Sequence, residues 1–140
     1  MHTRRAIVCS MMAAGLSLTL LGCGGGGARS DAEATRDLKA IGLAYHNFND
    51  QSGGRAPKDA EDLKKFVEMD SKTAYPGLKD GRYIFIWNVR LLDMSPTSDY
   101  ILAYEKDVPT KGGPVLYGDA TVKDLTAEEF KAAKKAQPKN

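Results

Sequence analysis

Apolar side chains recur at helical spacing just after residue 30. They stand three or four positions apart, as one stripe along a helix, at Ala34, Leu38, Ile41, Tyr45 and Phe48. Ser30 and Glu33 precede the stripe with the spacing of a capping box, and Gly53 and Gly54 follow it. This pattern predicts a helix over residues 31–50 that packs on a core, because the alternative, a coiled-coil seam, would span only about two heptads.

A second, shorter helix is predicted over residues 59–69. Pro57 precedes it, and Asp59 stands where a capping carboxylate is expected. Leu63, Phe66 and Val67 form its apolar face.

The pattern changes from helical to alternating in the second half of the chain. The segments GRYIFIWNVRLL (residues 81–92) and DYILAYE (residues 99–105) are rich in aromatic and β-branched residues, which favours strands. One face of the first segment holds Tyr83, Phe85, Trp87 and Val89. A third segment, PVLYGDATVKDL (residues 114–125), contains Gly118, Asp119 and Ala120 as the turn before a return strand at residues 121–123.

The chain closes on a helical segment, TAEEFKAAKKA. Thr126 and Glu129 form a second capping box, and Phe130 is expected to anchor this helix to the sheet. Four lysines gather near its end, at Lys131, Lys134, Lys135 and Lys139. They favour a solvated helix end, where cations complement the negative pole of the dipole, over a basic patch that faces a membrane.

The order of these elements predicts the fold class. A long helix, a short helix, a run of strands and a terminal helix indicate an α+β fold. The long N-terminal helix should pack on an antiparallel sheet of three or four strands, followed by a short C-terminal helix. This domain would occupy residues 30–140.

The first 22 residues have the layout of a secretory signal peptide. Arg4 and Arg5 form a short basic region, and the run over residues 6–21 carries no charge. A membrane-spanning helix is the alternative, but it needs about 20 apolar residues, and four glycines follow the run at residues 24–27.

The end of this segment resembles the lipobox of bacterial lipoproteins, with Leu20, Leu21 and Gly22 before Cys23. The resemblance implies that Cys23 receives a lipid, such as palmitate, and becomes the first residue of the mature chain. Residues 23–29 would then be a lipidated cysteine with a Gly-rich tether. Cys9 would be lost with the signal peptide, which leaves one thiol, no disulfide and no metal site at Cys23. The alternative is an ordinary secreted protein with a spare thiol.

Processing would also change the charge. Arg4 and Arg5 are two of the 20 basic residues, so the mature chain would carry as many basic as acidic residues, 18 of each. A neutral chain has no basic excess to neutralise phosphates, so nucleic acid is not an expected partner. The expected partners are the membrane, through the lipid on Cys23, and an envelope protein.

The candidate ligand-binding residues gather around the one histidine of the mature chain. His46, Asn47 and Asp50 share the end of the long helix, and Asp119 lies in the predicted hairpin turn. An EF-hand is excluded, because position twelve counted from Asn47 is Lys58 rather than a glutamate. His46 is expected to form a hydrogen bond from the helix to the sheet or the following loop. No catalytic residues, metal ligands or cofactor are predicted.

Two segments resemble a large bacterial family of pilin-like proteins of unknown function, which carries a prepilin-type leader and an H-X9-DG motif. They are DLKAIGLAYHNFNDQSGGRAP (residues 37–57) and VLYGDATVKDLTAEEF (residues 115–130). The chain departs from that family by having Asp119-Ala120 where the family has Asp-Gly, and by lacking a prepilin cleavage site. The resemblance therefore implies a pilin-like head on a lipid anchor rather than a filament subunit.

Together these patterns predict an exported, membrane-anchored lipoprotein of the cell envelope. Its role is expected to be structural or to involve protein interaction, without catalysis. The alternative is a small-molecule or metal-ion binding module with a site near His46 and Asp119.

Overall fold

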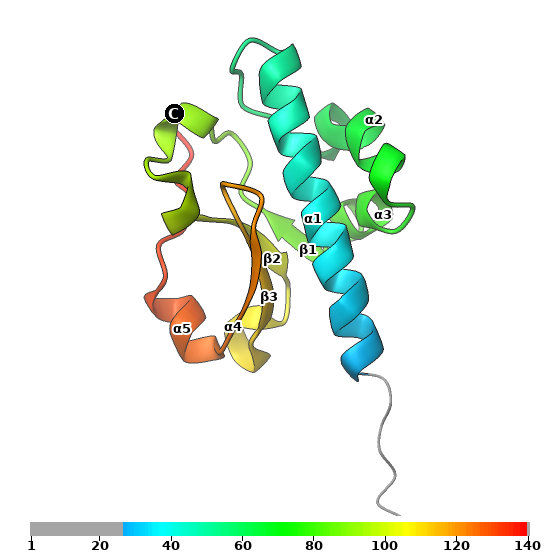
Figure 1. Cartoon of the computed structure of the whole chain (residues 1–140), viewed down its shortest axis with the longest axis vertical. Coiled ribbons are helices and arrows are strands. Elements are labelled where there is room, and N and C mark those ends of the chain that lie inside the picture. The colour runs from blue at the N-terminus through cyan, green and yellow to red at the C-terminus, as the bar shows by residue number, and fades with distance from the viewer. Residues whose placement is uncertain (1–26, 140) are drawn as a thin grey trace, which may run out of the picture.

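The computed structural model describes the backbone of residues 27–139 and the side chains of residues 31–139. It is an α+β fold with a long N-terminal helix, a four-stranded antiparallel sheet and a short C-terminal helix, as predicted. In chain order the elements are α1 (Gly27–Gln51), α2 (Ala60–Asp70), α3 (Ala74–Lys79), β1 (Tyr83–Phe85), η1 (Leu91–Asp93), η2 (Thr97–Asp99), β2 (Ile101–Glu105), α4 (Val108–Lys111), β3 (Gly113–Tyr117), β4 (Val122–Leu125) and α5 (Ala127–Ala132). Figure 1 shows α1 along the long axis, with the sheet on one side and α2 and α3 on the other.

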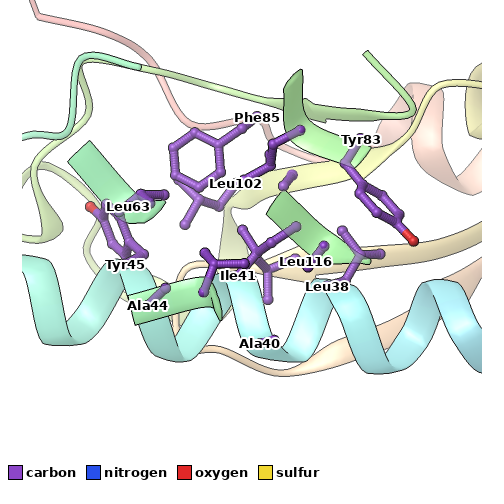
Figure 2. Packing of buried hydrophobic residues seen from close by; sticks show 14 of the residues in the cluster. Leu38, Ala40, Ile41, Ala44, Tyr45, Leu63, Tyr83, Phe85, Leu102 and Leu116 are labelled. Carbon is purple, nitrogen blue, oxygen red and sulfur yellow. The ribbon is translucent and has the colours of Figure 1, made fainter. Parts of the chain in front are cut away.

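The apolar stripe of α1 is buried, which confirms the expected packing. Leu38, Ile41 and Tyr45 are fully covered, and Phe48 is 8% exposed. They face Leu63 of α2 and the aromatic and aliphatic side chains of the sheet (Figure 2). Gly53 and Gly54, both with positive φ, end the helix as predicted.

The start of α1 differs from the prediction. Its backbone is helical from Gly27, so Ser30 lies inside the first turns rather than at the N-cap, and Gly27 begins a helix where a tether was expected. The carboxylate of Glu33, which was expected in that capping box, accepts a hydrogen bond from Arg82 Nη1 at 2.9 Å. Arg82 lies just before β1 and brings a cation to this face of α1. This partner is distant in the sequence, so local spacing could not predict it.

The four strands form a meander with the spatial order β1-β2-β3-β4, and every neighbouring pair is antiparallel. One cross-strand row faces α1 and consists of Phe85, Ala103, Leu116 and Val122. The opposite face contributes Ile101, Val115 and Tyr117 to a second, smaller core with Val108 and Phe130. Helices therefore cover both faces of the sheet.

The first strand is shorter than predicted. Only Tyr83–Phe85 pairs as a strand, although residues 81–92 alternate as a strand would. The chain leaves the sheet because Asn88, at φ 60°, turns it, and the Asn88 N–H then bonds the Pro57 carbonyl at 2.9 Å. Val89 is nevertheless fully buried, so the predicted face persists beyond the strand.

Two short α-helices, α3 and α4, were not predicted. The α3 segment contains Pro76 and Gly77, which in sequence are typical of a loop. Gly77 is needed there, because a Cβ on this residue would lie 2.5 Å from the ring of Tyr83. The other helix, α4, is a single turn between β2 and β3. Tertiary packing therefore decides both elements.

The second helix and the terminal helix agree with their predicted caps. Asp59 accepts hydrogen bonds from the backbone N–H groups of Glu61 and Asp62 at the start of α2. Thr126 and Glu129 form the capping box of α5. Phe130 is 6% exposed and packs on the outer face of the sheet, as expected. The return strand after the hairpin turn is β4, which begins at Val122.

Over the described part of the chain, every helix is too short or too polar to cross a bilayer.

Candidate functional site

His46 connects the long helix to the β3–β4 hairpin. Its Nε2 lies 2.8 Å from the Gly118 carbonyl oxygen, with the ring half-buried and edge-on to Tyr45. Because a carbonyl oxygen only accepts, Nε2 carries the proton and its N–H donates the hydrogen bond. This bond from the helix to the turn is the structural role predicted for His46.

Two glycines allow close packing around the hairpin, one against α1 and one against the segment at residues 94–97. A Cβ on Gly42 of α1 would lie 2.8 Å from Leu116 Cδ1 and 3.1 Å from Ala120 Cβ. A Cβ on Gly118 would lie 2.9 Å from the side chain of Met94 and from the Thr97 carbonyl oxygen. The hairpin therefore packs closely on α1 at Gly42 and on the segment at residues 94–97 at Gly118.

The hairpin turn itself is held by Asp119. Its Oδ1 accepts hydrogen bonds from Thr121 N at 3.0 Å and from Thr121 Oγ1 at 2.6 Å. Burial alone would raise the pKa of Asp119, but these bonds from Thr121 lower it overall. Ala120 follows with φ 64°, a backbone conformation that residues other than glycine rarely adopt. The turn therefore forms without the glycine of the Asp-Gly pattern, with a strained alanine in its place.

The predicted binding residues are brought together only in part. His46 and Asp119 meet at the hairpin turn through Gly118, whereas Asn47 and Asp50 are exposed on α1. Nearby, the side-chain nitrogen of Asn49 is buried and has no hydrogen-bond partner. Within residues 31–139, no three histidine, cysteine or acidic side chains are grouped closely enough to hold a metal ion. Cys23 lies outside the described residues.

A buried carboxyl that sequence reasoning missed lies on the other side of α1. Asp37 is fully buried, and its two oxygens accept hydrogen bonds from three hydroxyl groups. Ser71 and Thr73 donate to Oδ1 at 2.6 and 2.7 Å, and Tyr83 donates to Oδ2 at 2.7 Å. The cluster joins α1 to the segment before α3 and to β1.

The sequence held a signal for this cluster. Asp37 stands three positions after Ala34 and four before Ile41, so it lies on the apolar stripe that was expected to be buried. A carboxyl group on a buried face must find hydrogen-bond donors. Its partners could not be identified from the sequence, because they are 34 to 46 positions away.

Tyr45 of α1 and Tyr83 of β1 are similarly buried between the helix and the sheet. Burial, followed by the hydrogen bond to Asp37, raises the pKa of Tyr83 well above its ordinary value. Burial, with a smaller contribution from Asp93, does the same to the pKa of Tyr45. The Tyr45 hydroxyl donates to the Val89 carbonyl at 3.0 Å. Both phenols therefore act as hydrogen-bond donors in the folded core.

Two surface cavities of the domain carry opposite charge. The larger, of about 550 Å³, lies near the start of α1 and is lined by four acidic residues and Lys111. Two of its carboxylates are neutralised, since Asp107 pairs with Lys111 at 3.1 Å and Glu105 with Arg82 at 3.2 Å. The other cavity, of about 330 Å³, is lined mainly by arginine and lysine.

The arrangement of polar groups favours structural over chemical roles. His46, Asp119 and Asp37 each bind a group of the protein itself, and each bond joins separate elements or closes a turn.

No family model, curated protein or solved structure matches the chain.

Proposed function

We propose that this chain is a membrane-anchored lipoprotein of the cell envelope, in which a small pilin-like domain has a structural or protein-interaction role without catalysis. The observation that carries the proposal is the lipobox cysteine, Cys23, which precedes the first turn of α1 by only four residues. Residues 24–26 reach at most roughly 11 Å when extended. A lipid on Cys23 would therefore hold the domain close to the membrane by the N-terminal end of α1.

The packing of the domain supports a pilin-like relationship. A long N-terminal helix lies along one face of an antiparallel meander (Figure 1). The two segments that resemble the pilin-like family, residues 37–57 and 115–130, contact each other through Gly42 and His46. Segments that pack together in the fold are a sounder basis for a relationship than two separate short motifs.

A non-catalytic role is supported by the engagement of the candidate chemical groups. The imidazole of His46 is hydrogen-bonded to a backbone carbonyl, and the carboxyl group of Asp37 accepts hydrogen bonds from three hydroxyl groups. The alternative, an ion- or small-molecule site near His46 and Asp119, has less support, since both side chains already bond to the hairpin.

Replacement of the lipidated cysteine tests the anchor. In Cys23→Ala the thiol that takes the lipid is absent, so we expect the product to move from the membrane to the soluble fraction and to lose incorporation of labelled palmitate. Cys9→Ala is the matched control, because this cysteine lies inside the signal peptide and should leave both readouts unchanged. Membrane retention of Cys23→Ala at the wild-type level would contradict the anchor.

Crosslinking in intact cells tests the interaction role. The lipidated full chain should form a discrete adduct larger than the monomer, and mass spectrometry identifies the second component. A lipidated chain that forms no adduct with reagents of several lengths would argue against a protein-interaction role.

A further inference from the structure

The basic cavity lies at the end of the molecule opposite the start of α1. It is formed by the segment that follows α1, by residues 88–93 and by the C-terminal segment, which Figure 1 shows together at the top of the view. Its charged and polar lining residues are Arg55, Lys58, Asn88, Arg90, Asp93 and Lys139. Four cations and one carboxylate share a space of about 330 Å³.

The single carboxylate is fully engaged. Asp93 accepts two hydrogen bonds from the guanidinium of Arg90, both at 3.0 Å, and its Oδ1 lies 2.9 Å from Lys139 Nζ. Its side chain is only 5% exposed, whereas those of Arg90 and Lys139 are 50% and 67% exposed. The bonds from Arg90 and then Lys139 lower the pKa of Asp93 to about 2. Asp93 therefore positions two cations at the cavity and neutralises one of their charges.

The other two cations have no such partner. Among residues 31–139, Arg55 and Lys58 form no ion pair, although Asp62 accepts the backbone N–H of Lys58 at 2.9 Å. Arg55 donates from Nε to the Ser52 carbonyl at 3.4 Å and lies over the ring of Phe48. Among the described lining residues, the cations thus outnumber the carboxylate by three.

The backbone around these cations is fixed before any ligand arrives. Pro57, between Arg55 and Lys58, is buried, and its carbonyl accepts the Asn88 N–H at 2.9 Å. Asn88 has φ 60°, which asparagine tolerates better than most residues. This bond holds the Arg55–Lys58 segment against the segment that carries Arg90 and Asp93. A backbone fixed in this way need not be ordered when a ligand binds, which lowers the entropic cost of binding.

We propose that this cavity binds a small soluble oxyanion, either a phosphate or a carboxylate. Guanidinium groups bind both by paired N–H···O bonds, and ammonium groups add charge without directional demand. The excess is local rather than a property of a strongly basic chain, because the full sequence carries 20 basic and 18 acidic residues. The proposal does not depend on the lipid anchor.

Calorimetric titration tests this inference on the full-length chain in a neutral detergent. Inorganic phosphate and succinate are the two probes, each at low ionic strength of about 20 mM, where surface charges are weakly screened. We expect saturable binding of at least one of them, weakened as sodium chloride is raised. Arg55→Gln/Lys58→Gln should weaken that binding by roughly tenfold or more.

The matched control is Lys72→Gln/Lys106→Gln, which removes the same charge from two exposed lysines away from the cavity. It should bind the probe like the wild type, and far-UV circular dichroism should show that all variants are folded. Phosphate binding alone assigns the site to phosphates, and succinate binding alone assigns it to carboxylates. The proposal is overturned if neither probe binds, if the Arg55 and Lys58 variant binds normally, or if the control loses binding equally.

Discussion

At the scale of single residues, the polar atoms of the core are used to connect elements. Asp37 is the clearest case, because one carboxyl group receives hydroxyl donors from three other positions. Such a group is destabilising if left without partners, by about 1–3 kcal/mol for each unsatisfied bond. Its position on the apolar stripe was visible in the sequence, but its partners were not.

Ala120 provides a prediction at this scale. Its φ of 64° strains a residue that has a Cβ by about 1–2 kcal/mol, and glycine adopts that conformation freely. Glycine also has more freedom in the unfolded chain, which offsets about 0.4–1 kcal/mol of the gain. We therefore expect Ala120→Gly to raise the free energy of unfolding by about 0.5–1 kcal/mol, measured by urea denaturation.

An alanine with ordinary helical geometry is the control for that substitution. Ala32 is exposed inside α1, so Ala32→Gly should lower stability rather than raise it. If Ala120→Gly is as destabilising as Ala32→Gly, then the lost contact between Ala120 and Gly42 outweighs the relief of strain.

At the scale of elements, the sequence predicted those features that depend only on neighbouring residues. The apolar stripe of α1, the Asp59 cap of α2 and the capping box of α5 each depend on residues within a few positions of one another. The predictions failed where a distant partner intervened. Glu33 accepts a hydrogen bond from the distant Arg82, and the strand that begins at Tyr83 ends early because Asn88 bonds to Pro57.

The bond between α1 and the β3–β4 hairpin can be tested directly. His46→Ala removes the donor to the Gly118 carbonyl, a bond whose net contribution is about 1 kcal/mol. Amide hydrogen exchange should then become roughly fivefold faster for Tyr117 and Ala120, whose N–H groups form the hydrogen bonds of the turn.

The neighbouring residue serves as the control for this experiment. Asn47 is exposed on α1, so Asn47→Ala should leave the exchange rates of Tyr117 and Ala120 unchanged. The Gly112 amide, bonded to the Val108 carbonyl in α4, should exchange alike in all variants. If the amides of Tyr117 and Ala120 exchange at the same rate in His46→Ala and in the wild type, the bond from His46 does not stabilise the hairpin turn.

At the scale of the whole molecule, stability depends on a sheet covered on both faces. The larger core joins α1, α2 and the inner face, and the smaller core joins α5 and α4 to the outer face. After α5 the chain returns to β2, where Ile101 exchanges hydrogen bonds with Lys134 and Ala136. The C-terminal segment therefore secures the outer layer.

The buried phenols predict how the whole fold responds to alkali. The pKa of Tyr83 and that of Tyr45 are raised in the folded protein, whereas an unfolded tyrosine titrates near about 10. Their contribution to stability is complete below pH 10 and is lost as the pH rises toward the folded pKa values. The free energy of unfolding should fall by up to about 1.4 kcal/mol per pH unit for each tyrosine.

Urea denaturation between about pH 8 and pH 11 measures this slope. Tyr83→Phe should be less stable at pH 8, because its hydrogen bond to Asp37 is lost, yet its stability should fall less steeply above pH 10. Tyr45→Phe should reduce the slope in the same way, and the double variant should reduce it further. Parallel curves for the wild type and all three variants would contradict a role for these phenols.

The α+β order, the long apolar stripe and the caps of α2 and α5 followed from spacing along the chain alone, because the interactions that create them act over one or two helical turns or across one hairpin. The tertiary structure alone decided where Asp37, Glu33 and His46 find their partners, and why Gly42, Gly77 and Gly118 must lack a side chain. It alone also gathered Arg55, Lys58, Arg90 and Lys139 around one cavity. The reason is physical. The hydrogen bonds of Asp37, Glu33 and His46 join residues 34 to 72 positions apart, and only the packed sheet and helices bring their atoms within hydrogen-bond distance.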